Sequence, residues 1–166
     1  MSHKRVILCG PSATGKNFIR EAFQKKDYLI DVSYTTRSPR ENEKEGTDYR
    51  FISEKRFIER INDSFFYEYV KYGDNYYGTG NWEWNKANIF IMETEGINKI
   101  KPEDRNDCLI IYINTPFDVR LRRMRKLRKW DEDEILKRIK TDFEKFKGFK
   151  DYDIEISSMT DNEYKM

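Results

Sequence analysis

The sequence predicts an α/β fold with a parallel central sheet, helices on both of its faces and a phosphate-binding loop. Two observations carry this prediction. Short apolar runs typical of buried strands alternate with segments of helical periodicity along the 166 residues. A glycine-flanked loop follows the first apolar run directly, where the ligand-binding turn of such a sheet is expected. The length favours one domain.

Apolar or alternating runs predict the strands, at residues 6–9, 28–32, 49–52, 65–72, 89–92, 108–113 and 151–156. The run at 65–72 ends at a turn signal, Gly73-Asp74-Asn75. Residues 33–45 are mostly polar, so we expect an exposed loop there. We expect the whole stretch 33–86 to form a small antiparallel insertion mounted on the core.

Helical spacing of apolar residues predicts helices over 15–26, after Ser53, after Thr94, from Thr115 and from Asp131. Ser53 can cap its helix, and Asp131 with Glu134 resembles a capping box. The buried faces are expected to hold Phe57, Ile58 and Ile61 in the helix after Ser53, Phe117, Leu121, Met124 and Leu127 in the helix from Thr115, and Ile135, Ile139, Phe143 and Phe146 in the last helix.

Charged side chains make up 37% of the chain, but the net charge is only +2. This near balance gives no general reason to expect binding to nucleic acid or to a membrane. Cys9 and Cys108 lie in apolar runs without a disulfide spacing, which predicts buried, reduced thiols. We see no signal peptide and no apolar stretch of membrane-spanning length, so we expect a cytoplasmic protein.

The loop after the first strand is the strongest functional signal. Glycines at both ends let backbone N–H groups turn toward phosphate oxygens, and the start of the next helix adds partial positive charge. Lys16 supplies a full charge. The predicted phosphate site consists of Gly10, Pro11, Ser12, Ala13, Thr14, Gly15, Lys16 and Asn17. The alternative is an ordinary strand-to-helix turn with an exposed lysine.

Three further motifs have a highly specific spacing, namely TTRSPR at 35–40, GTDY at 46–49 and NYYGT at 75–79. With the loop, they closely resemble guanylate kinase over residues 6–156. The resemblance implies transfer of the terminal phosphoryl of ATP to GMP or dGMP, with Mg²⁺ accompanying ATP. It also implies a three-layer phosphate-loop kinase core (1–32 and 87–166), a GMP-binding insertion (33–86) and a helical lid (about 122–138).

The resemblance also assigns roles by position. The GMP-binding set is Ser33, Arg37, Arg40, Tyr49, Glu68, Tyr77, Thr79 and Glu93, and the catalytic set is Lys16, Arg125, Arg128 and Arg138. Two guanidinium forks suit a phosphate dianion. A buried carboxylate at Glu68 would accept from N1 and N2 of guanine, whereas adenine presents an acceptor at N1. Guanine selectivity therefore follows if Glu68 is buried.

The chain departs from the family pattern in three places. Asn17 stands where a magnesium-ligating hydroxyl is usual, and its amide oxygen is the candidate metal ligand. Ile91 and Glu93 stand where two aspartates are usual. The segment 80–88 looks short and carries unexpected tryptophans at Trp82 and Trp84.

Alternatives therefore stay open. One is a catalytically impaired module that uses the GMP pocket to bind a phosphorylated peptide. Another is a nucleoside monophosphate kinase for a different base. The basic run at 120–129 could be a solvated face, an RNA-contacting patch or the approach to the lid. The sequence is compatible with either a monomer or a homodimer.

Overall fold

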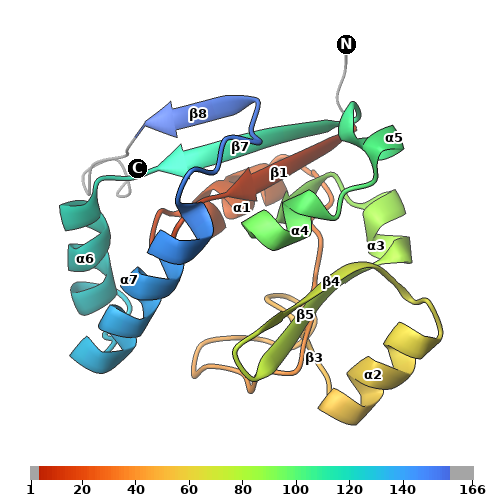
Figure 1. Cartoon of the computed structure of the whole chain (residues 1–166), viewed down its shortest axis with the longest axis horizontal. Coiled ribbons are helices and arrows are strands. Elements are labelled where there is room, and N and C mark those ends of the chain that lie inside the picture. Colours follow the sequence, from red (N-terminus) through yellow and green to blue (C-terminus); the bar gives the residue numbers. More distant parts are fainter. Residues whose placement is uncertain (1–3, 158–166) are drawn as a thin grey trace.

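The computed structural model describes residues 4–157, and two sheets organise this part of the chain (Figure 1). The core sheet has the strand order β6-β1-β7-β8 and is parallel throughout. Its strands are β1 (Arg5–Cys9), β6 (Ile89–Ile91), β7 (Cys108–Asn114) and β8 (Ile154–Ser157). The parallel α/β core predicted from the sequence is confirmed.

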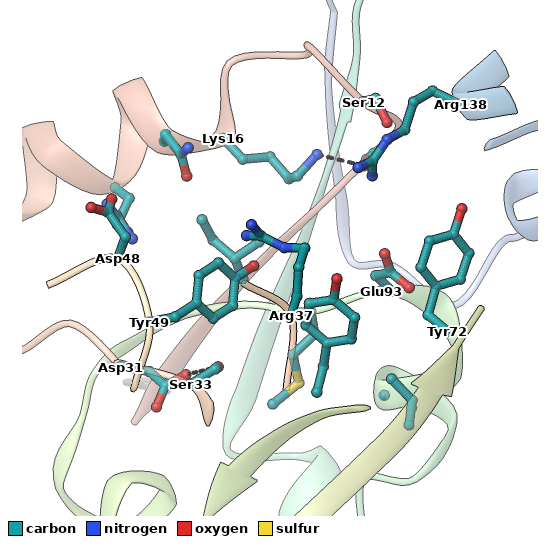
Figure 2. Close-up of a pocket in the computed structure, with 18 of the residues that line it drawn as sticks. Ser12, Lys16, Asp31, Ser33, Arg37, Asp48, Tyr49, Tyr72, Glu93 and Arg138 are labelled. Atoms are coloured by element: carbon teal, nitrogen blue, oxygen red, sulfur yellow. Dashed lines mark hydrogen bonds and ion pairs between the residues drawn. The ribbon is translucent and has the colours of Figure 1, made fainter. Parts of the chain in front are cut away.

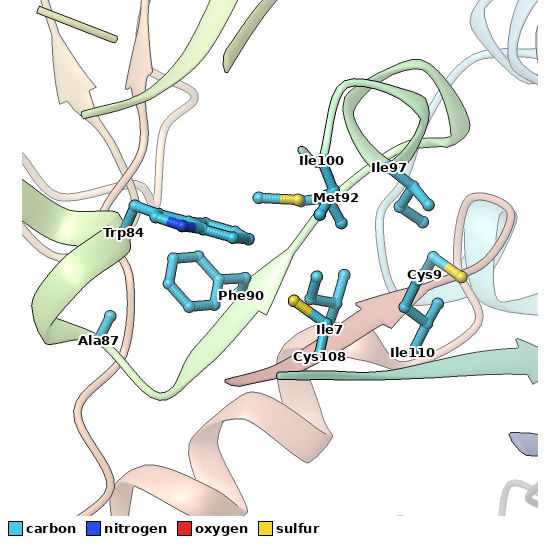
Figure 3. Packing of buried hydrophobic residues seen from close by; sticks show 10 residues of the cluster. All are labelled: Ile7, Cys9, Trp84, Ala87, Phe90, Met92, Ile97, Ile100, Cys108 and Ile110. Carbon is cyan, nitrogen blue, oxygen red and sulfur yellow. The ribbon is translucent and has the colours of Figure 1, made fainter. Parts of the chain in front are cut away.

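Successive residues of β1 serve opposite faces of the core sheet, as the two-residue period of a strand requires. Leu8 is fully buried and belongs to the cluster that packs under α1 (Lys16–Gln24) through Ile19 and Phe23. Ile7 belongs to a second cluster on the other face (Figure 3). That cluster also holds Cys9, Trp84, Ala87, Phe90, Met92, Ile97, Ile100, Cys108 and Ile110. Both cysteines are free and buried, as predicted.

Three short helices, α3 (Asn81–Lys86), α4 (Thr94–Asn98) and α5 (Pro102–Arg105), lie beside the second cluster (Figure 1). The sequence predicts α4, from the helix start expected after Thr94, but it predicts neither α3 nor α5. Trp84 of α3 is only 2% exposed, and its ring stacks on Tyr67 with centroids 3.9 Å apart. Of the two unexpected tryptophans, Trp84 is therefore a core residue, whereas Trp82 is 64% exposed.

The second sheet has the order β3-β2-β5-β4. Its strands are β2 (Tyr34–Thr35), β3 (Arg50–Phe51), β4 (Phe66–Tyr72) and β5 (Asn75–Gly80). The hairpin of β4 and β5 is antiparallel, but β2 pairs with β3 in parallel, so the sheet is mixed rather than purely antiparallel.

The expectation of an exposed loop over 33–45 is wrong at its start. Tyr34 and Thr35 form β2 and are buried, with exposed fractions of 7% and 0%. Their polar groups have partners in the interior, since the Thr35 hydroxyl donates to the carbonyl of Tyr76 at 2.9 Å and the Tyr34 hydroxyl donates to Glu83 of α3 at 3.1 Å. Hydroxyl-bearing residues in a short inner strand therefore look like a loop in the sequence.

The helix α2 (Glu54–Asn62) covers the second sheet. Its cap is confirmed, because the Ser53 hydroxyl accepts from the backbone N–H of Arg56 at 3.2 Å. Phe57 is fully buried and stacks on Phe66 at 4.3 Å, but Ile58 is 41% exposed, so its expected place on the buried face is wrong.

The predicted strand at 28–32 is also wrong. Only Ile30 forms a single bridge, to Ile89 at the outer edge of β6, and Tyr28 and Leu29 are exposed. The backbone N–H of Leu29 donates instead to the side chain of Asn88 at 3.1 Å. A segment lying against a sheet edge keeps the apolar composition of a strand without its ladder.

Two helices, α6 (Phe117–Lys126) and α7 (Glu132–Phe146), pack against each other beside the core (Figure 1). The Asp131 cap is confirmed, as its carboxylate accepts from the N–H of Glu134 at 2.8 Å. The buried faces are narrower than predicted. Met124 and Ile135 are buried, but Phe117, Leu127 and Phe143 are exposed, and a buried Arg123 takes part of the inner face of α6.

None of the helices in the described part of the chain has the length and apolar character that a bilayer crossing needs.

Candidate active site

A cavity of about 250 Å³ opens where the carboxyl ends of β1 and β6 face the second sheet. Figure 2 shows Lys16 and Arg138 on one side of this cavity and Arg37 and Tyr49 on the opposite side. We call residues 33–86, which contain the second sheet, the second unit. Among the residues that line the cavity are Gly10, Ser12, Ala13, Lys16 and Asn17 from the glycine-rich loop, Ser33, Arg37, Arg40, Tyr49, Glu68, Tyr77 and Thr79 from the second unit, and Glu93, Arg128, Trp130, Arg138 and Asp142 from the core, α7 and the turn between α6 and α7.

The backbone of the loop has the curvature that anion binding needs. Ala13 and Gly15 both adopt positive φ values, 61° and 94°. Gly10 has φ 153°, and a side chain there would clash, because its Cβ would lie 2.6 Å from the carbonyl oxygen of Ile113. The first turn of α1 receives no side-chain cap. Lys16 and Asn17, which open α1, line the cavity, so this helix N-terminus can attract an anion there.

Lys16 holds its ammonium group inside the loop. Its Nζ donates to the carbonyl oxygens of Gly10 and Pro11, each at 2.7 Å. Burial lowers the pKa of Lys16 to about 8, while the carboxylates of Asp142 and Glu93 act in the opposite direction. A bound phosphate would add further negative charge and hold the lysine in its charged form.

Asp142 of α7 is a site residue that the sequence reasoning missed. Its carboxylate accepts from the backbone N–H of Ser12 at 2.9 Å and from the Ser12 hydroxyl at 3.1 Å. Arg120 of α6 bridges the same pair, donating to Asp142 and to the carbonyl oxygen of Ser12, both at 3.1 Å. An aspartate in the middle of a charged helix gave no signal of this contact, which joins α6 and α7 to the phosphate loop.

Arg37 and Arg40 come together at the entrance from the second unit. Both guanidinium NH groups of Arg37 donate to the Glu43 carboxylate at 2.9 Å, and the backbone N–H of Arg40 donates to it at 2.8 Å. Although burial acts the other way, the hydrogen bonds and charge of Glu43 raise the pKa of Arg37 above its ordinary value. Burial lowers the pKa of Arg40, and the charges of Arg37 and Arg138 lower it further. Guanidinium groups from the second unit and from α7 therefore share one region.

Tyr49 and Tyr77 lie next to these arginines. Their ring centroids are 6.0 Å apart, and the Arg37 guanidinium lies 5.4 Å from the centre of the Tyr49 ring. Burial raises the pKa of Tyr49 to about 12, so its phenol stays a neutral hydrogen-bond donor near pH 7. Neutral donors complete an anion site without adding charge that the site would have to balance.

The opposite end of the cavity is acidic and buried. Glu68 is 8% exposed and accepts from the Thr79 hydroxyl at 2.7 Å. Burial raises the pKa of Glu68 above its ordinary value, although the Thr79 hydrogen bond opposes this. The burial on which the predicted guanine selectivity depends is thus present.

Asp31 is a second residue that the sequence reasoning missed. It is 7% exposed, and one of its oxygens accepts from the Ser33 hydroxyl at 2.6 Å, while the other is buried without a hydrogen-bond partner (Figure 2). Burial raises the pKa of Asp31 to about 7. Its place near the end of the apolar run 28–32 was the available signal, because acidic residues at the carboxyl ends of strands often face a ligand.

The remaining candidates are spread along the last two helices. Arg128 and Arg138 line the cavity, and Arg138 pairs with Glu134 at 2.8 Å. Arg125 lies outside the cavity lining and pairs with Glu132 at 2.8 Å on the exposed side of α6. The structure thus brings two of the three candidate arginines to the site.

Metal-binding groups in the cavity are few. Among residues 4–157, no cluster of His, Cys, Asp or Glu has an arrangement suited to holding an ion by itself. Asn17 is exposed at the cavity, and Glu93 pairs with Lys145 of α7. This donor set suits an ion held mainly by phosphate oxygens and water, with one amide oxygen from the protein, which is how magnesium is usually bound.

A glycine-rich loop between the first strand and first helix of a parallel sheet, facing a cavity lined by arginines, defines a nucleotide-binding protein of the phosphate-loop class. The guanylate kinase family model matches residues 2–164 of the chain. The chain belongs to the guanylate kinase family.

Individual relatives agree with this assignment. The chain is similar to guanylate kinase of Wolinella succinogenes, with 32% identity over 160 residues, 91% of this chain and 74% of the relative. It is also similar to guanylate kinase of Latilactobacillus sakei, with 31% identity over 91% of this chain and 79% of the relative. A crystal structure of guanylate kinase from Anaplasma phagocytophilum matches its fold with a TM-score of 0.67, 23% identity and coverage of 96% of this chain and 78% of the other.

Proposed function

We propose that this protein transfers the terminal phosphoryl group of ATP to GMP or dGMP, giving ADP and GDP or dGDP. One observation carries the proposal: Lys16 from the phosphate loop, Arg37 and Arg40 from the second unit and Arg138 from α7 all line one cavity whose far end holds the buried Glu68. Positively charged side chains in the middle of the cavity suit the phosphate groups of a nucleotide, and the carboxylate at one end suits its base. The family assignment supports this activity and favours neither the peptide-binding module nor a kinase for another base.

We propose that the two nucleotides bind on opposite sides of the cavity. ATP phosphates would occupy the loop at residues 10–17, against its backbone N–H groups and Lys16. GMP would occupy the insertion, residues 33–86, mounted on a core of residues 1–32 and 87–166. The lid would comprise about residues 122–138 and carry Arg128 and Arg138. The outermost residues of these limits, 1–3 and 158–166, lie outside the described part of the chain.

The GMP phosphate would take the place of the Glu43 carboxylate beside Arg37 and Arg40. Glu43 now holds the two NH groups of Arg37 and the backbone of Arg40, which is the arrangement a phosphate dianion also favours. A phosphate brings more charge and more acceptor oxygens than a carboxylate does. With Tyr49 and Tyr77 adding neutral donors, the site would bind the phosphate on several sides.

Guanine recognition would rest on Glu68. Because its second oxygen is not used by Thr79, the carboxylate can accept from the N1 and N2 groups of guanine. Adenine would direct a lone pair at this buried carboxylate, a mismatch that costs on the order of several kcal/mol. Ser33 and Thr79 would complete the polar contacts to the base.

No general base is required for the transfer. The phosphate of GMP is already close to doubly charged near pH 7 and is itself the nucleophile. The protein's task is to hold two mutually repelling anions in line and to stabilise the charge on the moving phosphoryl group. Lys16, Arg128 and Arg138 would supply that positive charge, and closure of the lid would exclude water.

A divalent cation, which we propose to be Mg²⁺, would neutralise charge on the ATP phosphates when bound. Asn17 would hold it through its amide oxygen, since this is the loop residue next to Lys16 at the start of α1. We also propose that the protein acts on free nucleotides in the cytoplasm, as a monomer or a homodimer, without nucleic acid or membrane partners.

A coupled assay of ADP formation tests the proposal. The purified protein with magnesium and ATP should form ADP when GMP or dGMP is added, and far less with AMP, CMP or UMP. Titration with ATP alone should also show binding. No ADP formation with GMP or dGMP under conditions where the protein is folded would overturn the proposal. Binding of GMP without any binding of ATP would instead support the peptide-binding module.

A further inference from the structure

Trp130 lies between two arginines that come from opposite sides of the cavity. The guanidinium carbon of Arg40, on the loop after β2, lies 5.4 Å from the centre of the Trp130 ring. The guanidinium carbon of Arg138, on α7, lies 5.2 Å from the same ring. Trp130 itself lines the cavity and is half-buried. One aromatic ring therefore contacts both units that surround the proposed phosphate positions.

The turn between α6 and α7 sets the position of the Trp130 ring. Lys129 has a φ of 53°, a left-handed conformation that residues other than glycine rarely adopt. Directly after it, the backbone N–H of Trp130 donates to the carbonyl oxygen of Met124 at 3.2 Å. The next residue, Asp131, caps α7. The left-handed turn at Lys129, the hydrogen bond of the Trp130 N–H and the cap at Asp131 thus fix the backbone on both sides of the Trp130 ring.

Without the Trp130 ring, repulsion between their positive charges would drive the Arg40 and Arg138 guanidinium groups apart. The charge of Arg138 lowers the pKa of Arg40, which means that the two cations are close enough to repel each other. The face of an indole ring carries negative potential and attracts guanidinium groups. A ring that contacts both cations offsets part of their repulsion without neutralising either one. Arg138 also pairs with Glu134, and the Glu43 carboxylate is engaged by Arg37 and by the backbone N–H of Arg40, so the Trp130 ring is the group that both guanidinium groups contact.

We propose that Trp130 is a positioning residue that holds Arg40 and Arg138 together at the junction of the two nucleotides, and this inference rests on the proposed function. Through Arg40 it acts on the binding of the GMP phosphate. Through Arg138 it acts on the transfer step. It contacts no reacting atom, so its effect depends on both arginines being present.

Three substitutions distinguish the effect of the aromatic ring of Trp130 from the effect of its side-chain volume. Trp130→Phe keeps an aromatic face, Trp130→Leu keeps apolar bulk without one, and Trp130→Ala removes both. We expect Trp130→Leu and Trp130→Ala to raise the KM for GMP and to lower kcat, with kcat/KM falling about tenfold or more. Trp130→Phe should keep kcat/KM within about threefold of the parent enzyme. Equal behaviour of the Phe and Leu variants would overturn the role of the aromatic face.

A double-mutant cycle tests whether Trp130 works through the arginines. In an Arg138→Ala background, Trp130→Leu should no longer lower kcat, and in an Arg40→Ala background it should no longer raise the KM for GMP. Additive effects in both backgrounds would overturn the inference. Thermal unfolding of each variant identifies any loss that comes from misfolding, and the Phe variant keeps the comparison available if the Ala variant is unstable.

Fluorescence gives a readout that does not depend on turnover. The difference between the spectra of the parent protein and Trp130→Phe isolates Trp130 from Trp82 and Trp84. This difference signal should change when GMP is added, because the GMP phosphate would contact the Arg40 guanidinium, which lies over the ring. A parent protein inactive toward GMP would refute the proposed function, whereas an active parent whose Trp130→Leu variant matches it would refute only the present inference.

Discussion

The Asp142 carboxylate accepts two hydrogen bonds from Ser12, one from its backbone N–H at 2.9 Å and one from its hydroxyl at 3.1 Å. A residue of the last long helix is thereby bound to the tip of the phosphate loop, 130 positions away in the chain. Arg120 completes the contact with an ion pair in which both side chains are largely buried. The position of α7, which carries Arg138, is consequently tied to the loop that would hold ATP.

Asp142→Ala should destabilise the protein and weaken ATP binding together. Removing the carboxylate leaves the buried Arg120 guanidinium unpaired, which costs about 3 kcal/mol in the free energy of unfolding. The loop also loses its tether, so the KM for ATP should rise about tenfold. Urea denaturation and steady-state kinetics measure the two effects. Asp142→Asn keeps one acceptor and should lose less in both, and an ATP KM unchanged in the Ala variant would contradict the expected coupling.

Glu68→Gln should lower kcat/KM for GMP by more than any loss of folding stability in the variant can account for. The amide presents both a donor and an acceptor to guanine, so one hydrogen bond to the base is lost and kcat/KM should fall about 100-fold. Thr79→Val is the matched control, because it removes the hydroxyl that donates to Glu68 but keeps the carboxylate. Its loss should be smaller. Comparable kcat/KM values for GMP in Glu68→Gln and the parent would place guanine recognition elsewhere.

Arg138→Ala and Arg125→Ala form a matched pair on adjacent helices. Arg138 lines the cavity, so its removal should lower kcat about 100-fold by withdrawing charge from the transferred phosphoryl group. Arg125 is exposed and pairs with Glu132 away from the cavity, so its removal should change kcat less than about twofold. Single-turnover measurements of phosphoryl transfer compare the two directly. A larger loss for Arg125 would mean that the lid rearranges before the reaction.

Asn17→Thr tests the proposed metal ligand. A hydroxyl at this position offers a shorter and better-placed oxygen at the start of α1, so the Mg²⁺ concentration for half-maximal activity should fall about threefold to tenfold. Removal of divalent ions with a chelator should abolish transfer in the parent protein and in the variant alike. Protection of the ATP complex against thermal unfolding by Mg²⁺ gives an independent measurement. A half-saturating Mg²⁺ concentration that is the same in both proteins would show that residue 17 does not contact the ion.

Asp31 should make stability depend on pH. Its pKa rises from 3.8 to about 7 on folding, so the folded protein holds this proton more tightly than the unfolded chain does. Its stabilising contribution is complete below pH 3.8 and is lost as the pH rises through 7. Asp31→Asn removes the titration, so the variant should gain stability relative to the parent as the pH rises from 3.8 to about 7. Asp74→Asn, at the exposed β4–β5 turn, is the control and should show no such relative gain.

The core could be predicted from the sequence because buried parallel strands carry unbroken apolar runs. Val6 to Cys9 and the run at 108–113 show this pattern, and both lie in the observed sheet. The boundaries of the second sheet were harder to predict, since β2 consists only of Tyr34 and Thr35, whose hydroxyls find their partners in α3 and in β5. A short inner strand of this kind has no period to detect.

The sequence predicted only those site residues that belong to contiguous motifs. The contiguous patterns identified Lys16, Arg37 and Glu68, which the structure brings to one cavity. Asp142 and Trp130 reach that cavity through the relative placement of α6 and α7, which depends on long-range packing that no local pattern encodes. For the same reason the sequence aligned Arg138 best with the family pattern but did not show which of Arg125, Arg128 and Arg138 reaches the cavity.

The anchoring of α3 limits how the two halves of the protein can move. Arg5, at the start of β1, donates from its Nε to the carbonyl oxygen of Trp84 at 2.8 Å and lies over the Trp84 ring. Since α3 is one of the two chain connections between the second sheet and the core, that connection is clamped at its base. A displacement of the insertion relative to the core would therefore have to carry α3 along with β1 or break both of these contacts.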